Sequence, residues 1–185
     1  MALIFGTNTS DNVNFGQGEA ISGFTSFTFM CWANVTSFSA SSRYFGYKAQ
    51  SQATFEREFS LRSTGQIEVF AKFSTTHSTA RSANTAGNIL TLNKWMFVGM
   101  SVDGSKVPRL YLGDKNTPVY ELSYTTQQTG VGTIASDTTS NLIIGNIAGA
   151  LNLPLLGSIA SFQWHNAALS LAELREQQYS PKLIT

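Results

Sequence analysis

The sequence predicts an all-β protein: a two-sheet antiparallel β-sandwich with a short C-terminal helix. Three observations lead to this fold class. Apolar and polar residues alternate with a period of two in many short segments. Charged residues are only 12% of the 185 residues, whereas Phe occurs 13 times, a balance that suits a packed core and argues against disorder. Loops rich in Ser, Thr and Gly separate the segments. Because no repeat or linker interrupts the pattern, we expect a single domain over residues 1–185.

The clearest strand pattern covers residues 27–35, where Phe27, Phe29 and Cys31 alternate with Thr28 and Met30. Residues 95–102 alternate in the same way. Further strands are expected at residues 55–61, 66–73, 109–112, 119–124, 142–145 and 158–164, and loops at residues 36–43, 74–87 and 125–141. Many short strands at this spacing, followed by one helix, indicate two packed sheets.

Two local signals set a turn and a helix start. Asp103-Gly104 predicts a hairpin turn after residues 95–102, because Gly adopts positive φ without steric cost. Ser170 followed by Glu173 has the spacing of a capping box, in which hydroxyl and carboxylate bond to each other's backbone N–H. We therefore expect the helix to begin directly after Ser170.

Composition excludes several partners. The net charge of +1 is spread along the chain without a Lys/Arg cluster, so no nucleic-acid partner is expected. The apolar stretch at residues 142–162 contains Asn146, Asn152 and Pro154, which rules it out as a membrane span. Cys31 is the sole cysteine and fits a buried core position. The first residues lack the basic start and long apolar core of a signal peptide, so we expect synthesis and folding in the cytoplasm.

Patterns that suggest catalysis are incomplete. Glu56 and Glu58 share one strand face, as in enzymes that cleave glycosides, but a third acidic partner is missing, and we expect a solvated face with Arg57 on the other side. Residues 99–103 and 130–135 only partly match the nucleophile-elbow and dinucleotide-binding motifs. His77 is expected in an exposed loop, far in sequence from the second histidine. The sequence therefore predicts no enzyme.

Several motifs occur in a familiar order: Leu-Ile-Phe-Gly at residues 3–6, Val-Asn-Phe at 13–15, Phe-Thr-Phe-Met-Cys-Trp at 27–32, Leu-Asn-Lys-Trp at 92–95, and the stretch 157–170. In this order the chain resembles the concanavalin A-like family, in its laminin G-like, pentraxin-related branch. The resemblance implies a jelly-roll sandwich and leaves function open, since the fold hosts lectins, adhesion modules, glycosidases and virion proteins.

The resemblance also bears on calcium. Many relatives carry an Asp just after the Gly-x-Ile of the last strand, where it helps to hold a structural calcium. Ala160 stands at that position here, and Asp11 is left as a single carboxylate in the opening loop. A calcium ion needs six to eight oxygen ligands. We therefore expect no cofactor and no metal site, with calcium at Asp11 as the open alternative.

Contact residues are sought among exposed aromatic and basic side chains. Arg43, Tyr44 and Tyr47 follow a Ser-rich loop and form the best exposed candidate, because Tyr and Arg supply stacking area and hydrogen bonds. Trp164 and His165 end the last strand, where core packing with a surface imidazole is the default interpretation and ligand contact is the alternative.

Two function classes remain. The first is a structural protein, a bacteriophage virion component such as a capsid decoration or fibre protein. Its partners would be other virion subunits, as a homo-oligomer or bound to a capsid, with Leu183 and Ile184 as an assembly tail. The alternative is a carbohydrate-binding, lectin-like module. The sequence favours the virion component, because the composition lacks charge and no export signal is recognised.

Overall fold

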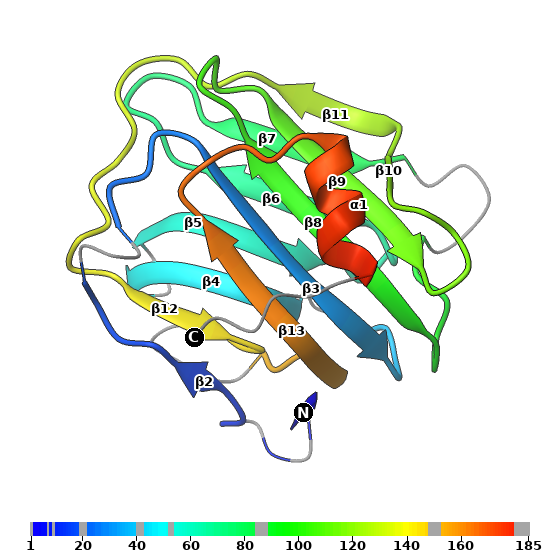
Figure 1. Cartoon of the computed structure of the whole chain (residues 1–185). Helices are drawn as coiled ribbons and strands as arrows, with labels where there is room; N and C mark the ends of the chain where they lie inside the picture. Colours follow the sequence, from blue (N-terminus) through cyan, green and yellow to red (C-terminus); the bar gives the residue numbers. More distant parts are fainter. Residues whose placement is uncertain are drawn as a thin grey trace.

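The computed structural model describes residues 2–6, 8, 10–18, 22–39, 43–51, 54–83, 89–147 and 153–179. Within these residues the backbone forms two antiparallel sheets stacked face to face and one helix (Figure 1). The six-stranded sheet has the order β1 (Ala2–Phe5), β13 (Gly157–His165), β3 (Phe27–Val35), β8 (Trp95–Val102), β9 (Pro108–Asp114) and β10 (Tyr120–Glu121). The seven-stranded sheet has the order β11 (Tyr124–Gln128), β7 (Ser78–Ser82), β6 (Ile67–Ala71), β5 (Thr54–Leu61), β4 (Arg43–Ser51), β12 (Asn141–Ile144) and β2 (Val13–Asn14). The predicted sandwich is confirmed.

The core lies between the sheets and is built from the alternating apolar residues of both. Phe29 on β3 meets Phe59 on β5 edge to face, with ring centroids 4.8 Å apart, a favoured aromatic geometry. Gly46 on β4 is required here, because a Cβ at this position would lie 2.2 Å from the Phe29 ring. The predicted core position of Cys31 is confirmed, since this side chain is fully buried.

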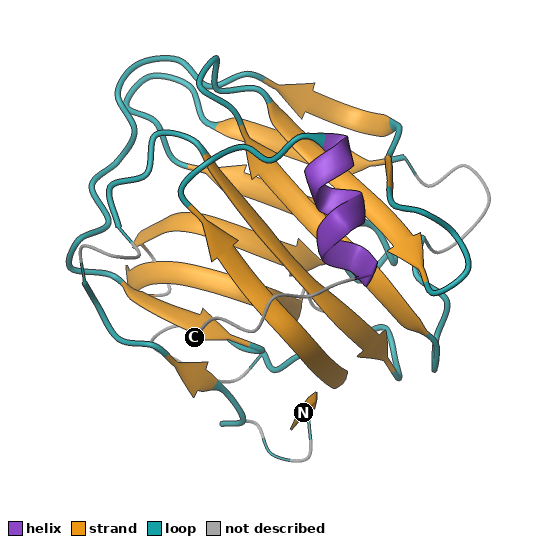
Figure 2. Ribbon diagram, viewed as in Figure 1, coloured by secondary structure: helices purple, strands orange, loops and turns teal. Residues whose placement is uncertain are grey.

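The helix α1 (Leu171–Tyr179) lies on the outer face of the six-stranded sheet (Figure 2). Leu174 packs there with Met30 and Phe97, which explains why both faces of β3 are buried. The predicted capping box is confirmed: the Ser170 N–H donates to Glu173 Oε2 at 2.7 Å, and the Glu173 N–H donates to Ser170 Oγ at 3.3 Å. The helix is therefore fixed at its start and along its apolar side.

Two segments expected as loops contain strands. Residues 74–87 include β7, and residues 125–141 overlap β11, which pairs with β7. Both strands are short and rich in Ser, Thr and Gln, so their sequences lack strong alternation. Backbone pairing of β7 with β6, and of β11 with β7, places them in the sheet. These pairings are tertiary contacts that no local pattern reveals.

Candidate functional site

The outer face of the seven-stranded sheet carries a group of charged and aromatic side chains. Antiparallel register places them in two rows across the strands. One row aligns Tyr47, Glu58, Phe70 and Thr79, and the other aligns Tyr44, Ser60, Glu68 and Arg81. Cross-strand neighbours stand about 5 Å apart at Cβ, so the members of each row are in contact range. We call these two rows, together with Arg62 directly after β5, the binding face.

Glu58 lies at the centre of the binding face and is half-buried. Burial raises the pKa of this carboxyl to about 7, and the nearby Glu68 carboxylate adds to the rise. Ser60 Oγ donates a hydrogen bond to Glu58 Oε1 at 3.4 Å, which opposes the shift only partly. Near neutral pH the Glu58 carboxyl therefore occurs in both the donor and the acceptor form.

Glu68 anchors two arginines beside Glu58. Arg62 donates to both carboxylate oxygens of Glu68, at 3.0 and 3.2 Å, and the Arg81 Nε–H donates to Oε2. The Glu68 carboxylate is 8% exposed, whereas the Arg62 and Arg81 side chains are 35% and 34% exposed. Two oriented guanidinium groups thus keep N–H donors at the surface, a geometry that suits oxygen-rich ligands.

Aromatic rings border this charged centre. The Tyr44 and Tyr47 rings meet at a centroid distance of 5.0 Å, and the Phe70 ring lies 4.9 Å from that of His77. Tyr44 and Phe70 are half-buried and His77 is exposed. His77 therefore has the predicted exposure, and its ring belongs to the edge of the binding face.

The expectation that Tyr47 is an exposed contact residue is wrong. Tyr47 is 1% exposed because β4 is an interior strand between β5 and β12, where Ile143 and Ala49 pack against the ring. Tyr44 keeps a half-exposed ring. Arg43, at the start of β4, is also half-exposed and donates to Ser39 Oγ at 2.6 Å.

Trp164 and His165 lie on the six-stranded sheet, away from the binding face. The Trp164 ring stacks on Phe27 at 5.4 Å with an interplanar angle of 11°, so this residue contributes to core packing. His165 Nε2 is 3.0 Å from Gln163 Oε1, and burial lowers the pKa of its imidazole.

The structure differs from the sequence expectation at Glu56 and Glu58. We expected a solvated pair, but Glu56 is 6% exposed and accepts the Ser140 hydroxyl at 2.9 Å. Arg57 does lie on the other side of β5, yet it is buried and pairs with Asp137. Each carboxylate therefore accepts a hydrogen bond from a serine hydroxyl of the protein, Glu56 from Ser140 and Glu58 from Ser60.

Asp11 closes a turn in the opening loop. Its Oδ2 accepts the Asn8 N–H at 2.8 Å, and its backbone oxygen accepts the Asn146 side-chain amide at 3.0 Å. Across the described ranges, no group of three or more His, Cys, Asp or Glu side chains is placed to hold a metal ion. The tail residues Leu183 and Ile184 lie outside the described residues, and no helix in the described part is both long and apolar enough to cross a bilayer.

A family comparison identifies the fold. The sequence model described as the concanavalin A-like lectin/glucanases superfamily matches residues 6–175. The chain belongs to this superfamily. The resemblance noted from the sequence motifs is thereby confirmed. A search of curated proteins finds no match.

Solved structures with the same fold include proteins that bind sugars. A Bacteroides ovatus protein assigned to carbohydrate binding matches with a TM-score of 0.66 and 16% identity over 96% of this chain and 46% of its own. The CBM40 module of a Ruminococcus gnavus sialidase was solved with α2,3-sialyllactose. It matches with a TM-score of 0.62 and 12% identity, over 96% of this chain and all of its own. The LG4-5 domains of mouse laminin α1 match with a TM-score of 0.64 and 13% identity, over 92% of this chain and 43% of their own. At these identities the likeness establishes the fold alone.

In this superfamily member, sequence reasoning missed most of the binding face. The period-two pattern of β5 and β6 places Glu58, Glu68 and Phe70 on the outer side, so that signal is available in the sequence. Arg81 carries no such signal, because β7 is not recognisable locally. Only the register between β6 and β7 brings Arg81 to Glu68.

Proposed function

We propose that this protein is a non-catalytic carbohydrate-binding module that holds sugar on the binding face. The observation that carries the proposal is the half-buried Glu58 carboxyl, set between aromatic rings and beside the Glu68-anchored arginines. Sugar rings offer C–H faces to aromatics and pairs of hydroxyls to carboxylates and guanidinium groups. The Bacteroides ovatus and Ruminococcus gnavus proteins support the same class of ligand.

Binding rather than hydrolysis follows from the carboxylates. Glycoside cleavage uses two carboxyl groups that flank one bond. Glu68 is occupied by Arg62 and Arg81, and Glu56 is buried against Ser140. Among the residues that the structure describes, Glu58 therefore has no second carboxyl poised to work with it, and we assign it to hydrogen bonding with the ligand.

The charge of the binding face depends on Glu58. Arg62, Arg81 and Glu68 together carry a net charge of +1. When Glu58 is ionised, its negative charge brings this net charge to zero. Because its pKa is about 7, the face becomes net positive below neutral pH. We infer that acidic glycans bind more tightly as the pH falls, whereas neutral glycans respond less.

A glycan array followed by titration calorimetry tests the proposal, with neutral oligosaccharides and sialyllactose as probes. Tyr44→Ala should weaken binding about tenfold, whereas Tyr44→Phe keeps the ring and most of the affinity. Tyr120→Ala is the matched control, because Tyr120 is an exposed tyrosine on the other sheet. No saturable binding by folded protein, or an equal loss in Tyr120→Ala, would refute a sugar site on this face.

The virion role favoured by the sequence stays a prediction, together with its capsid or oligomer partners and its cellular location. Its assembly tail, Leu183 and Ile184, lies outside the described residues. Deletion of residues 181–185 should lower the oligomer mass measured by light scattering if the tail drives assembly. An unchanged mass would remove the tail from that role.

A further inference from the structure

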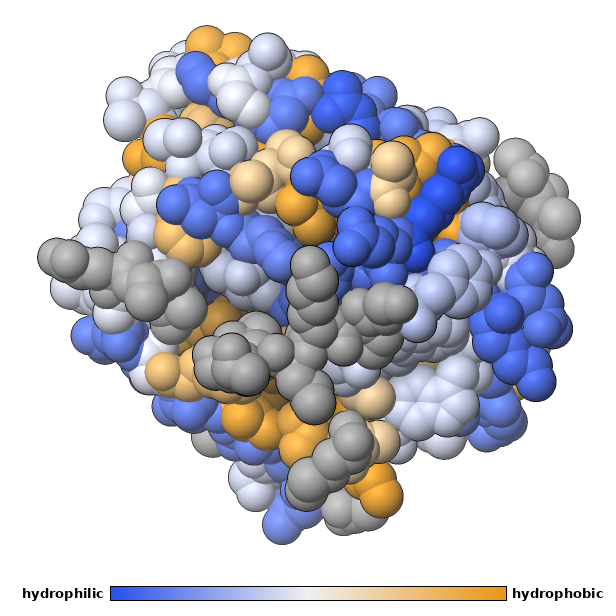
Figure 3. Space-filling model, viewed as in Figure 1, coloured by the Kyte–Doolittle hydropathy of each residue, from blue (hydrophilic) through white to orange (hydrophobic). Residues whose placement is uncertain are grey.

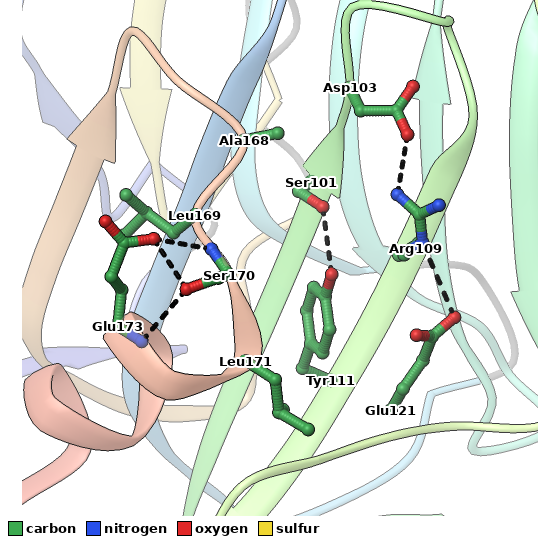
Figure 4. A pocket seen from close by; sticks show the side chains of 10 residues that line it. All are labelled: Ser101, Asp103, Arg109, Tyr111, Glu121, Ala168, Leu169, Ser170, Leu171 and Glu173. Atoms are coloured by element: carbon green, nitrogen blue, oxygen red, sulfur yellow. Dashed lines mark hydrogen bonds and ion pairs between the residues drawn. The ribbon is translucent and has the colours of Figure 1, made fainter.

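A separate cavity lies on the opposite layer of the sandwich, between the start of α1 and strands β8 and β9 (Figure 4). Its volume is about 340 Å³, within the usual range for small-molecule sites. Hydrogen bonds from Thr28 on β3 hold its rim: Thr28 Oγ1 donates to the Ala167 carbonyl at 2.7 Å and accepts the Leu169 N–H at 2.9 Å. The cavity is therefore framed by fixed backbone and does not depend on a free loop.

The charged groups that line this cavity are mainly acidic. Asp103, Glu121 and Glu173 line the cavity with one guanidinium, that of Arg109, so the lining carries two net negative charges at neutral pH. Arg109 pairs with Asp103 and Glu121, and Glu173 lies on the opposite side, bonded to Ser170. Arg109 is held to one side, where it donates to Asp103 Oδ2 at 2.7 Å and lies 3.8 Å from Glu121 Oε1. Hydrogen bonds from Ser170 lower the pKa of Glu173, which keeps it ionised. Such a field repels anions and attracts cations.

Acceptor atoms remain available around the cavity. Within the described residues, Glu121 Oε1 accepts the Tyr124 hydroxyl at 2.7 Å and Glu173 Oε2 accepts from Ser170, while the second oxygen of each carboxylate has no hydrogen-bond partner. Figure 3 shows many hydrophilic side chains over α1. A cation that enters from solvent thus meets free carboxylate oxygens.

The base of the cavity adds a pair of hydroxyl groups. Ser101 and Tyr111 are 1% and 4% exposed, and their oxygens are 3.2 Å apart (Figure 4). The two hydroxyl groups have one O–H donor each, and the hydrogen bond between them occupies one of these donors. The pair can therefore accept from a ligand N–H and still donate one hydrogen bond.

One wall of the cavity is apolar. Ala168, Leu169 and Leu171 come from the loop before α1 and from its first residue. Leu171 points toward Tyr111 and Ala168 lies beside Ser101, whereas Leu169 lies on the side of Glu173 (Figure 4). This arrangement fits a ligand with an aliphatic stem on one side and a compact positive head, because the stem is desolvated while the charge meets oxygen atoms.

We propose that this cavity is a second ligand site, independent of the binding face, and that it takes a small alkylammonium group. The head would lie between Glu121, Glu173 and the Ser101–Tyr111 hydroxyl pair, with its stem against Ala168 and Leu171. The same chemistry is presented by a free diamine, an amino sugar or a lysine side chain of a peptide. The site is cation-selective whichever of these is the natural source.

Titration calorimetry at about pH 7.5 and low salt tests the selectivity. Cadaverine should bind at least about tenfold more tightly than pentanol, and glutarate should not bind, because the three share a chain of similar length and differ in charge. Glucosamine and lysine amide, run in parallel, distinguish an amino sugar from a peptide source. Equal affinities for cadaverine and pentanol would overturn the proposal.

Variants locate the bound amine. Glu121→Gln removes one charge but keeps an oxygen for Tyr124, and it should weaken cadaverine binding about fivefold or more. Glu176→Gln is the matched control, since Glu176 is exposed on α1 but does not line the cavity. A loss as large in Glu176→Gln would show diffuse attraction and refute the site. Tyr44→Ala must leave cadaverine binding unchanged, which separates this proposal from the sugar site.

Discussion

Two clusters beside the seven-stranded sheet have the same pattern of charge and different surroundings. In each, one carboxylate lies between two cations. Asp137 pairs with Arg57 and lies 3.8 Å from the Lys48 ammonium, and all three side chains are at most 1% exposed. Glu68 pairs with Arg62 and Arg81, whose side chains are about one-third exposed. We call these the buried cluster and the surface cluster.

The buried cluster joins segments that are far apart in the sequence. Lys48 on β4 donates to Ser22 Oγ at 3.0 Å and to the carbonyls of Asp137 and Ser140 at 3.1 and 3.0 Å. Arg57 donates to the Phe24 carbonyl at 3.0 Å. Burial lowers the pKa values of both cations, and Asp137 opposes that effect. This cluster therefore fixes loops to the sheet.

The surface cluster makes few ties of that kind. Its members lie on neighbouring strands or at a strand end, so register already holds them together. Water solvates the one-third exposed guanidinium groups and screens their attraction to the 8% exposed Glu68 carboxylate, so these ion pairs contribute less to stability than those of the buried cluster. What the surface cluster retains is access, because its guanidinium groups still face solvent. The contrast assigns stability to the buried cluster and ligand binding to the surface cluster.

The largest effect is expected from breaking the buried cluster. Asp137→Asn removes the charge that balances Lys48 and Arg57 and should lower the free energy of unfolding by about 3–5 kcal/mol. Denaturant unfolding followed by tryptophan fluorescence measures it. A loss below about 1 kcal/mol would show that water or relaxation compensates the cations, and the contrast between the clusters would fail.

The same contrast should appear between two tyrosines of β4. Tyr47→Ala removes a ring that is 1% exposed and should lower the free energy of unfolding by about 3 kcal/mol. Tyr44→Ala, at a half-buried ring, should lower it by about 1 kcal/mol while weakening sugar binding. Thermal unfolding of both variants checks the order, and a reversed order would contradict the burial of Tyr47.

Glu58 should make stability depend on pH. Its pKa is about 7 in the folded protein against 4.5 for the free side chain, so the folded state binds the extra proton between these values. Stability contributed by Glu58 is therefore lost as pH rises through that window. Glu58→Gln should be more stable than the parent by roughly 1–3 kcal/mol at about pH 8 and nearly equal at about pH 4. Parallel pH curves for the two proteins would contradict the shift.

The smallest stability effect is expected in the surface cluster. Glu68→Gln should lower the free energy of unfolding by about 1 kcal/mol or less, because water can solvate the one-third exposed guanidinium groups. The variant leaves Arg62 and Arg81 without their anchor and should weaken the binding of neutral sugars several-fold. Calorimetry and denaturant unfolding on the same sample compare the two readouts. A stability loss as large as that of Asp137→Asn would make the two clusters equivalent.

Much of the fold could be predicted because its signals are local. The alternation in β3 and β8, the turn after Asp103 and the capping box of Ser170 and Glu173 each depend on residues within a few positions of one another. Such patterns persist whatever the rest of the chain does. The placement of Glu58 opposite Arg57 on β5 was predictable for the same reason.

The remaining features depend on contacts between distant segments. Tyr47 has the sequence pattern of a surface residue, but β12 pairs with β4 and Ile143 packs against its ring. Likewise, β7 becomes a strand only through its pairing with β6. Lys48 and Asp137 are 89 residues apart, and the cavity beside α1 joins β8 and β9 to the loop before the helix. Burial, which decides whether a charged side chain stabilises the fold or meets a ligand, is a property of the packed molecule. The local pattern therefore determined the strands and their faces, and tertiary packing alone decided which faces were left open to bind.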